Sequence, residues 1–354
     1  MRQLKYREAI DEATRMAMAT DDSVFVFGVG VDDAKGIFGT TRGAFEQFGG
    51  KRVFDTPLSE ATLTGAAVGA ALSGMRPLLV HARNDFLMLT MDQIVNNAAK
   101  WRYMCGGLRV PMVIRAIIGR GWGQAAQHSQ SLQALFAHVP GLSVIMPATP
   151  HDAKGLLLQA LRGEGPVVCL EHRWLYEKSG PVPEEDYTIP FGEAAVVRPG
   201  RDVTIVALSL MVWEALDAAQ ALAGEGIEAE VIDLRTVRPL DMETVLRSVV
   251  KTGRLVVADT SWRAFGAMAE VVSRVAEEAL DALKGPVVRV GLPDAPTPAS
   301  SVLEKAFYPG PKEIAAAARR TFERSVRSST VQTDNGAPTV LAPNTLVPEF
   351  KGPF

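Results

Sequence analysis

The sequence is poor in cysteine and in aromatic side chains. It contains two cysteines, Cys105 and Cys169, and 7% Phe, Trp and Tyr. Two cysteines this far apart argue against a disulfide-rich secreted domain and against a zinc site, so we expect two buried thiols in a reducing compartment. No apolar run reaches the roughly 18 residues that span a bilayer. The sequence therefore predicts no membrane helix.

Excess charge of either sign is also missing. Lys and Arg number 37 and Asp and Glu number 40, which gives a net charge of −3. This balance gives no reason to expect nucleic acid or an anionic membrane as a partner. Residues 1–22 contain acids and no apolar core, unlike a signal or transit peptide, and predict an amphipathic helix of a cytoplasmic protein.

Several catalytic and nucleotide-binding motifs are absent. There is no G-x-x-x-x-G-K-[ST] loop, and GVGVDDAKG has Asp33 where a dinucleotide fingerprint needs its third glycine. The S-x-x-K and G-x-S-x-G patterns of serine nucleophiles are missing as well. These absences leave little support for a nucleotide-binding protein or a serine hydrolase.

What is present is an alternation of apolar strands and helices in a chain of 354 residues, which is long enough for two domains. In the first half we predict strands at 23–31, 76–82, 110–119, 142–149 and 165–172, and helices at 60–73, 90–104, 129–138 and 151–162. Continuous apolar strands separated by helices indicate a parallel sheet covered on both faces. Ligands bind such sheets beyond the carboxyl ends of the strands.

A second α/β unit follows a segment rich in proline, glycine and charge. We predict a first domain at 1–176, a linker at 177–200, a second α/β domain at 201–327, and an extended or disordered tail at 328–354. In the second domain we predict strands at 202–209, 252–260 and 286–294, a strand followed by a loop at 227–241, and helices at 211–226, 265–283 and 311–325. The fold class is α/β with two domains.

Three residues follow strand ends of the first domain and are candidates for a shared crevice. Glu60 begins a predicted helix, Phe86 follows the strand at 76–82, and His128 follows the strand at 110–119. Each also has an ordinary structural explanation. Glu60 suits the helix dipole, with Ser59 or Thr56 as a cap, Phe86 suits a core, and His128 suits a loop or cap.

Longer stretches resemble a known family. KRVFDTPLSEATLTGAAVGAALSGMRP, MDQIVNNAAKWRYMCGG, AAQHSQSLQALFAHVPGL and GIEAEVIDLRTVRPLD are similar to the β subunit of the thiamine-diphosphate-dependent decarboxylating component of 2-oxoacid dehydrogenase complexes. That group includes pyruvate, branched-chain 2-oxoacid and acetoin dehydrogenases. The resemblance implies a pyrimidine-binding domain followed by a domain like the C-terminal domain of transketolase.

The resemblance also implies roles for particular residues. Glu60 matches the glutamate that hydrogen-bonds the aminopyrimidine of thiamine diphosphate, and Phe86 matches the aromatic residue that stacks on this ring. His128 matches the active-site histidine, and Leu58 lies where the family has an apolar residue near the cofactor. A carboxyl group at the ring nitrogen favours the imino tautomer, which takes the C2 proton across a short intramolecular gap. Glu60 and His128 are thus the expected catalytic residues.

The family binds the cofactor's other end on a different polypeptide. We find no G-D-G…N-N motif here, so the resemblance implies that an α subunit holds the diphosphate and Mg²⁺ in an α2β2 heterotetramer, and that this chain supplies no metal ligand. The family's potassium-site loop typically carries Asp and Asn, whereas residues 162–165 of this chain are Arg, Gly, Glu and Gly, so the resemblance does not extend to a potassium site. The small residues of 60–73, including Gly65 and Gly69, indicate close packing against another subunit beside the cofactor or inside this chain.

Two sets of residues depart from the family. Val29 lies where the family has an acid, so a carboxylate near the cofactor is missing from this chain. Around Phe86 the family is more apolar, whereas this chain has His81, Arg83, Asn84 and Asp85. Either Arg83 and His81 line a site for a polar or anionic substrate group, or Arg83 pairs with Asp85.

Three functions follow from these patterns. The leading one is oxidative decarboxylation of a 2-oxoacid with acyl transfer to a lipoyl group, with a lipoyl acyltransferase core as a further partner. A second is a carboligase or transketolase-like subunit that acts without a lipoyl partner. The third is a non-catalytic scaffold subunit, against which the joint presence of Glu60, Phe86 and His128 argues.

Overall fold

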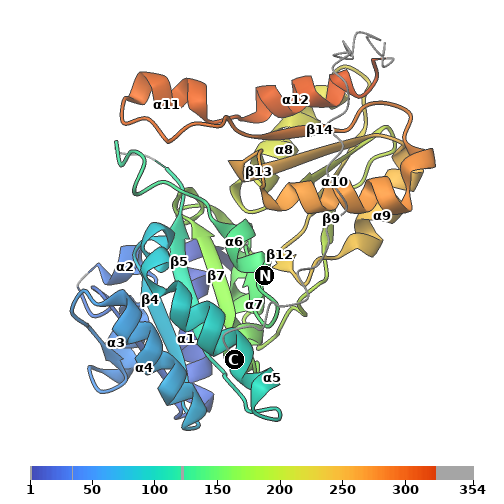
Figure 1. Ribbon diagram of the computed structural model, residues 1–354. Helices are drawn as coiled ribbons and strands as arrows, with labels where there is room; N and C mark the ends of the chain where they lie inside the picture. The colour runs from blue at the N-terminus through green and yellow to red at the C-terminus, as the bar shows by residue number, and fades with distance from the viewer. Residues whose placement is uncertain (1, 34, 121–122, 324–354) are drawn as a thin grey trace, which may run out of the picture. The chain divides into compact units, whose positions relative to one another are not determined.

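The structure of the chain is a computed structural model that describes residues 2–33, 35–120 and 123–323 (Figure 1). Two α/β regions are present, each built around its own sheet. The predicted tail at 328–354 lies outside the described residues. Within the described residues, no helix has the length and apolar character needed to cross a membrane.

The first region contains a seven-stranded sheet in the order β12-β6-β7-β5-β4-β2-β3. Its strands are β2 (Val24–Gly28), β3 (Val53–Phe54), β4 (Arg76–His81), β5 (Val113–Ile118), β6 (Ser143–Ile145), β7 (Val167–His172) and β12 (Thr236–Arg238). All neighbouring strands run parallel except β12, which pairs antiparallel with β6. The predicted parallel sheet is therefore confirmed, and its strand ends meet at one edge.

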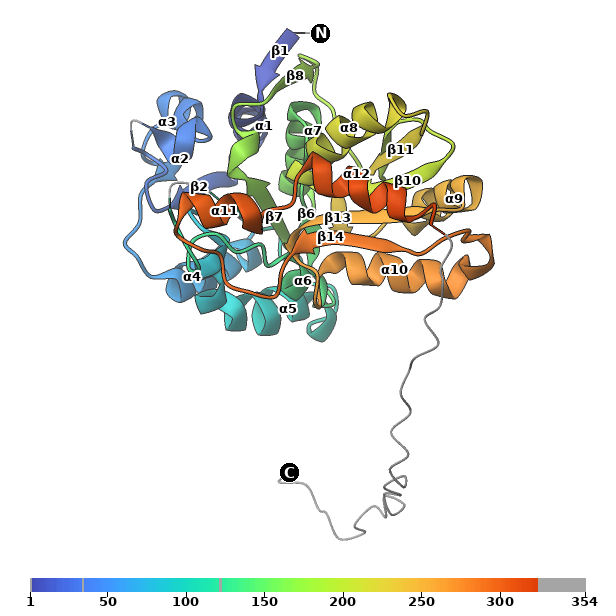
Figure 2. The ribbon, with the colours of Figure 1, turned by 90° about the horizontal axis from the view of Figure 1, so that it is seen from above.

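Helices cover both faces of this sheet. They are α1 (Tyr6–Thr20), α2 (Gly36–Gly39), α3 (Arg42–Phe48), α4 (Glu60–Leu72), α5 (Ala99–Met104), α6 (Gln133–Ala137) and α7 (Pro150–Arg162). In Figures 1 and 2, α4 and α5 lie on one face, and α1 and α7 pack together on the other. Helix α1 buries Tyr6, Ile10 and Ala13 along one stripe, as the amphipathic pattern predicts.

Two predicted helical segments differ in part from the structure. The helix predicted at 90–104 is present, but it contains a π-helical segment, η2 (Gln93–Ala98), before α5, and an unpredicted 3-10 helix, η1 (Asn84–Thr90), precedes it. Asn84 bonds to another loop, and such residues compete with α geometry. The helix predicted at 129–138 is only α6, because Gln130 and Ser131 give backbone groups to other elements.

The second region contains a five-stranded sheet in the order β14-β13-β10-β11-β9, in which β9 is antiparallel. Its strands are β9 (Ala195–Arg198), β10 (Val203–Ala207), β11 (Ala229–Asp233), β13 (Leu255–Trp262) and β14 (Val288–Leu292). Its helices are α8 (Leu210–Ala223), α9 (Met242–Thr252), α10 (Ala267–Glu278), α11 (Ser301–Phe307) and α12 (Pro311–Arg320), and the 3-10 turn η4 (Leu280–Ala282) follows α10. The 3-10 turn η3 (Arg173–Leu175) follows β7 of the first sheet. Figure 2 shows α8 and α12 on one face and α10 on the other.

The helices α9 and α11 were not predicted from the sequence. The start of α9 could have been recognised by its N-cap residue, since Asp241 accepts a hydrogen bond from the backbone N–H of Thr244 at 3.0 Å. The linker predicted at 177–200 contains the strand β8 (Ser179–Val182), which pairs with β1 (Arg2–Lys5), and also contains β9. The exact domain boundaries remain predictions.

The two cysteines differ in exposure. Cys169 is buried on β7, as expected, whereas Cys105 is exposed. The prediction of two buried thiols is wrong for Cys105, because this residue ends α5 at a surface turn formed by Gly106 and Gly107.

Candidate functional site

A cavity of about 250 Å³ lies at the carboxyl ends of β2 and β4, beside the start of α4. Glu60, Phe86 and Leu58 all line it, so the structure brings three of the four predicted site residues together. The remaining lining residues are mostly apolar: Gly28, Val29, Ser59, Leu63, Leu79, Val80, His81, Ala82 and Arg83. The position agrees with the rule that ligands bind beyond the ends of parallel strands.

Glu60 is the first residue of α4 and is half-buried. Ser59 is the N-cap residue, but its side chain accepts no capping bond, and the buried Thr56 hydroxyl has no partner among the described residues. Neither side chain therefore caps α4 in the way considered from the sequence. No side-chain hydrogen bond from the described residues occupies the Glu60 carboxylate. Both oxygens are available to a ligand at the helix N-terminus.

Gly28 shapes the wall of the cavity. Its φ is +145°, and a Cβ atom at this position would lie 2.2 Å from the carbonyl oxygen of Val80 on β4. Only glycine allows β2 and β4 to approach this closely and the chain to turn outward. The turn presents Val29, which is 37% exposed, to the cavity. Asp55 then accepts a hydrogen bond from the Gly30 N–H at 2.6 Å, which joins the loops after β2 and β3.

Phe86 and His128 are in direct contact. Their ring centroids are 5.3 Å apart and the rings are nearly perpendicular, at 81°. Three hydrogen bonds hold the loop of His128: Asn84 donates to the Gln130 carbonyl at 2.9 Å, and Gln130 donates to Asp85 from Nε2 at 2.9 Å and from its backbone N–H at 3.2 Å. His128 does not line the cavity itself, but it lies against the aromatic residue that does.

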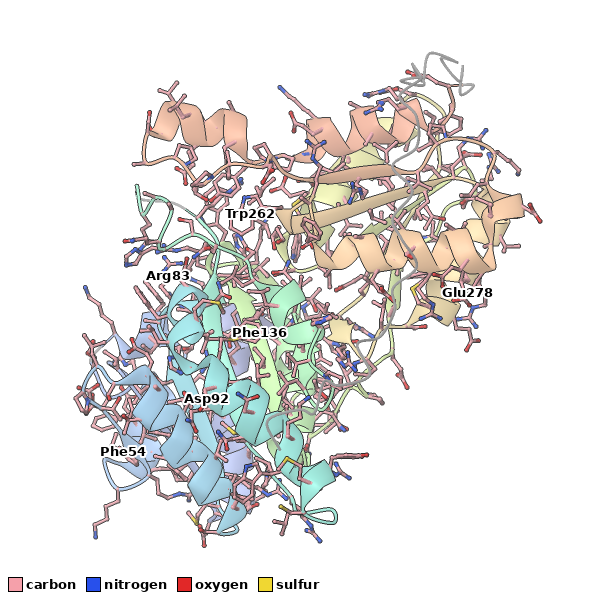
Figure 3. The ribbon with its side chains drawn as sticks, in the orientation of Figure 1. Phe54, Arg83, Asp92, Phe136, Trp262 and Glu278 are labelled. Atoms are coloured by element: carbon pink, nitrogen blue, oxygen red, sulfur yellow. The ribbon has the colours of Figure 1, made fainter. Side chains whose placement is uncertain are left out.

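His81 and Arg83 form the polar part of the lining. His81 is buried, its Nε2 has no partner among the described residues, and burial lowers its pKa to about 4. Arg83 donates to the carbonyl oxygen of Gly119 at 3.2 Å, and no described carboxylate, Asp85 included, lies within ion-pair distance of it. Of the two alternatives for Arg83, pairing with Asp85 is therefore not formed. Figure 3 labels Arg83 near the edge of the sheet.

Other residues of the site were not predicted from the sequence. Leu63, Leu79 and Val80 form apolar wall, and Asp55 fixes the loop after β2. Only their positions, at strand ends and in the first turns of α4, could have indicated that they line a site. In a sequence, a run of apolar residues predicts a buried core unless the strand ends that lie beside it are already known.

The lining fits a flat heteroaromatic ring. Apolar walls and the Phe86 ring suit its faces, and the free Glu60 carboxylate suits a protonated or N–H-bearing ring nitrogen. These are the requirements of the aminopyrimidine of thiamine diphosphate. The fit rests on the donor set and the cavity of this chain alone.

Comparison with known families covers most of the chain. Residues 2–178 match the transketolase pyrimidine binding domain, and residues 192–314 match the transketolase C-terminal domain. The first match contains the cavity and its lining residues, and the second contains most of the five-stranded sheet.

Individual proteins agree with these matches. The chain is 49% identical over 91% of its length to the β subunit of acetoin:2,6-dichlorophenolindophenol oxidoreductase from Cupriavidus necator, of which it covers 98%. It is 44% identical over 92% of its length to the β subunit of the pyruvate dehydrogenase E1 component from Rickettsia felis, covering 100% of that protein. A solved structure titled a split gene transketolase, inactive beta4 tetramer, superposes with a TM-score of 0.72 at 26% identity, covering 90% of this chain and 98% of that one. The chain belongs to the transketolase-like family of β subunits of thiamine-diphosphate-dependent 2-oxoacid dehydrogenases.

Proposed function

We propose that this chain forms the pyrimidine side of the active site in a heteromeric 2-oxoacid dehydrogenase, which decarboxylates a 2-oxoacid oxidatively and transfers the acyl group to a lipoyl arm. The observation that carries the proposal is the single cavity that joins Glu60 to Phe86, with His128 packed edge-on against Phe86. An acid that only caps a helix and a ring that only fills a core have no reason to line one cavity together, with a histidine packed against the ring.

Each residue then has a physical task. Glu60 would accept a hydrogen bond from the aminopyrimidine ring, in the first turn of a helix whose N-terminus fixes the carboxylate. Phe86 would stack on the ring and set its orientation, a contact worth on the order of 1 kcal/mol. Leu58, which is 78% exposed in the chain alone, would cover the ring from the open side.

Thiamine diphosphate, when held by Glu60 and Phe86, would supply the nucleophilic carbon and the electron sink that decarboxylation of a 2-oxoacid needs. His128 would hold or deliver a proton close to the reacting carbonyl, a task suited to imidazole near neutral pH. Its orientation depends on Phe86 and on the Gln130 clamp. Apolar walls at Leu63 and Leu79 would exclude water from the ring.

The complete site needs a second subunit. We propose an α subunit that binds the diphosphate and Mg²⁺, in an α2β2 heterotetramer located in the cytoplasm, with a lipoyl acyltransferase core as a further partner. Support comes from the missing G-D-G motif and from relatives whose names designate β subunits. The name of the Cupriavidus necator relative includes acetoin, so acetoin is a second candidate substrate beside a 2-oxoacid.

The test is decarboxylation by the complex reconstituted with its α partner. We expect Glu60→Ala to lower kcat by at least 100-fold, because the acid needed at the ring is lost. Glu243→Ala is a matched control, since Glu243 is also a first-turn acid, on α9, and is exposed. Turnover near that of the wild type in Glu60→Ala would contradict the cofactor assignment.

A second measurement separates the dehydrogenase from the carboligase. The wild-type complex should acylate a lipoyl domain as well as reduce an artificial electron acceptor. Reduction of the dye without acylation of any lipoyl domain would favour a subunit that works without a lipoyl partner.

A further inference from the structure

Three arginines follow neighbouring strands of the seven-stranded sheet. Arg83 lies two residues after β4, Arg120 two residues after β5, and Arg173 one residue after β7. Because β4, β5 and β7 are adjacent and parallel, these residues meet at one edge. We call Arg83, Arg120, Arg173 and His172, the last residue of β7, the basic cluster.

The members of the basic cluster are close enough to act on one another. Arg83 donates to the Gly119 carbonyl at 3.2 Å, and a Cβ atom on Gly119, whose φ is +95°, would lie 2.4 Å from His172 Nε2. Burial and the charges of all three arginines lower the pKa of His172 to about 3, so this histidine is neutral near pH 7. Burial and the charge of Arg83 lower the pKa of Arg173 to about 10.

Two arginines of the basic cluster lack a direct ion pair. In the described part of the chain, neither Arg83 nor Arg120 has a carboxylate within ion-pair distance, and the charges of Asp85 on Arg83 and of Glu214 on Arg120 act from farther away. Asp85, the nearest acid in sequence, accepts hydrogen bonds from Gln130 instead. Arg120 lies over the rings of Trp174 and Tyr308, at 4.0 and 4.3 Å from their centroids. Buried guanidinium groups without a carboxylate are costly, which indicates that an anion from outside this chain completes the cluster.

Arg83 connects the cluster to the cavity. It is only 5% exposed, yet it lines the cavity together with Glu60 and Phe86. The Gly119 carbonyl is its one hydrogen-bond acceptor among the described residues, which leaves further guanidinium N–H groups for a ligand. His81 lines the same cavity with an Nε2 that also has no described partner.

We propose that Arg83, supported by Arg120 and Arg173, binds a second carboxylate of the substrate, so that the complex acts on a dicarboxylic 2-oxoacid. The inference rests on the function proposed above. The carboxylate next to the ketone leaves as neutral carbon dioxide, and a cation holding it would stabilise the ground state more than the transition state. A distal carboxylate keeps its charge throughout, so its contact with Arg83 favours binding without opposing the reaction. Neutral acetoin offers no carboxylate to Arg83.

The test compares two substrates of equal chain length, 2-oxoglutarate and 2-oxopentanoate, in the complex with its α partner. The wild type should prefer 2-oxoglutarate in kcat/KM by about 10- to 100-fold, the range of a charge-assisted hydrogen bond. Arg83→Met should remove that preference, mainly through KM, and leave 2-oxopentanoate within about twofold. Arg83→Lys should restore part of it, and Arg247→Met, at an exposed arginine of α9, should change neither substrate.

Other outcomes overturn the inference. A wild type that prefers 2-oxopentanoate excludes a distal carboxylate, and an equal loss with both substrates in Arg83→Met gives this arginine no role in selection. A loss confined to the KM of thiamine diphosphate assigns the anion to the cofactor's diphosphate. Calorimetric titration of the wild-type complex with glutarate and pentanoate needs no variant, and equal affinities would also contradict the proposal. Inactivity of the wild type toward every 2-oxoacid, or an active Glu60→Ala, refutes the proposed function instead.

Discussion

The seven-stranded and five-stranded sheets treat the ends of their strands differently. Beyond β4, β5 and β7 the first sheet carries arginines and a cavity. The second carries buried acids instead, Asp233 at the end of β11 and Asp259 within β13, and burial raises their pKa values to about 8 and about 6. One region thus keeps positive charge at its edge, whereas the other keeps carboxyl groups that are easily neutralised.

One of these acids, Asp259, and the nearby Ser261 contact the first region. Gln133 of α6 donates to Asp259 at 2.6 Å, and Ser261 donates to the Ser131 carbonyl at 2.9 Å. The strand β12 leaves the second region to pair with β6. In the first region, neighbouring elements leave space beyond the strand ends, and the space forms a ligand site. In the second region, a neighbouring element fills that space, and the strand residues bind to it instead.

The largest expected effect tests how the first region holds charge. Arg115 and Glu171 form an ion pair with both side chains 1% exposed, and Tyr176 donates to Glu171 at 2.9 Å. Glu171→Ala leaves Arg115 buried and uncompensated, so the free energy of unfolding in urea should fall by about 3–5 kcal/mol.

Two variants control this prediction. The double replacement of Arg115 and Glu171 by Met should recover most of the loss, because no buried charge remains. Glu278→Ala, which breaks a surface pair with Arg274, should cost less than about 0.5 kcal/mol. Similar losses at Glu171 and Glu278 would mean that the first region does not depend on paired charge.

The next prediction concerns the opening of the first sheet. Gly28→Ala places a Cβ atom 2.2 Å from the Val80 carbonyl at a φ of +145°, so we expect a loss of roughly 2–4 kcal/mol in unfolding free energy and weaker binding of the cofactor. Gly50→Ala is the control, since a Cβ atom there meets nothing within 4 Å. Equal stability of the two variants in thermal and urea unfolding would show that β2 and β4 can separate at no cost.

A third prediction tests the neutral acids of the second region. The pKa of Asp259 rises from an ordinary 3.8 to about 6 because the group is buried. Between about pH 4 and 6 the unfolded chain releases a proton that the folded chain keeps, so this group lowers stability as pH rises and its effect is complete above pH 6. As pH rises from 4 to 7.5, the free energy of unfolding of Asp259→Asn should therefore increase by about 1–3 kcal/mol relative to that of the wild type.

Denaturant unfolding of both proteins across that range measures the difference. Asp281→Asn, at an exposed acid of η4, should show no such trend. A constant difference between Asp259→Asn and the wild type at all pH values would indicate that Asp259 has the same pKa in the folded and unfolded chains.

The smallest effect concerns the bare face of α4. A Cβ atom on Gly69 meets nothing within 4 Å, whereas one on Gly65 lies 3.2 Å from Gln93 Oε1. Gly69→Ala should raise the stability of the isolated chain by up to about 1 kcal/mol, and Gly65→Ala should gain less. If the face of Ala61, Ala66 and Gly69 contacts another subunit, Gly69→Ala should also weaken association with the α partner in sedimentation. Unchanged association would contradict a subunit contact at this face. The close packing of α4 would then be confined to Gly65 and its neighbours in this chain.

Much of the fold could be predicted because apolar strands and helical periods are local properties of the chain. The strands β2, β4, β5, β6 and β7 and the helices α1, α4 and α7 lie close to their predicted positions, whereas the two-residue strand β3 was not predicted. The helix η1 and the start of α6 were missed, since Asn84 donates to the Gln130 carbonyl across 46 residues. The strands β8 and β12 were missed for the same reason, because their partners β1 and β6 are remote in sequence.

The sequence by itself determined the two-domain α/β class, the family and the candidates Glu60, Phe86, Leu58 and His128, since residue type and spacing carry that information. Only the tertiary structure decided that Arg83 turns to Gly119 and the cavity instead of pairing with Asp85, and that Arg120 and Arg173 stand beside it. The physical reason is that the edge of a parallel sheet joins residues from strands far apart in the chain, so the charge at this edge is a sum that no single stretch of sequence contains.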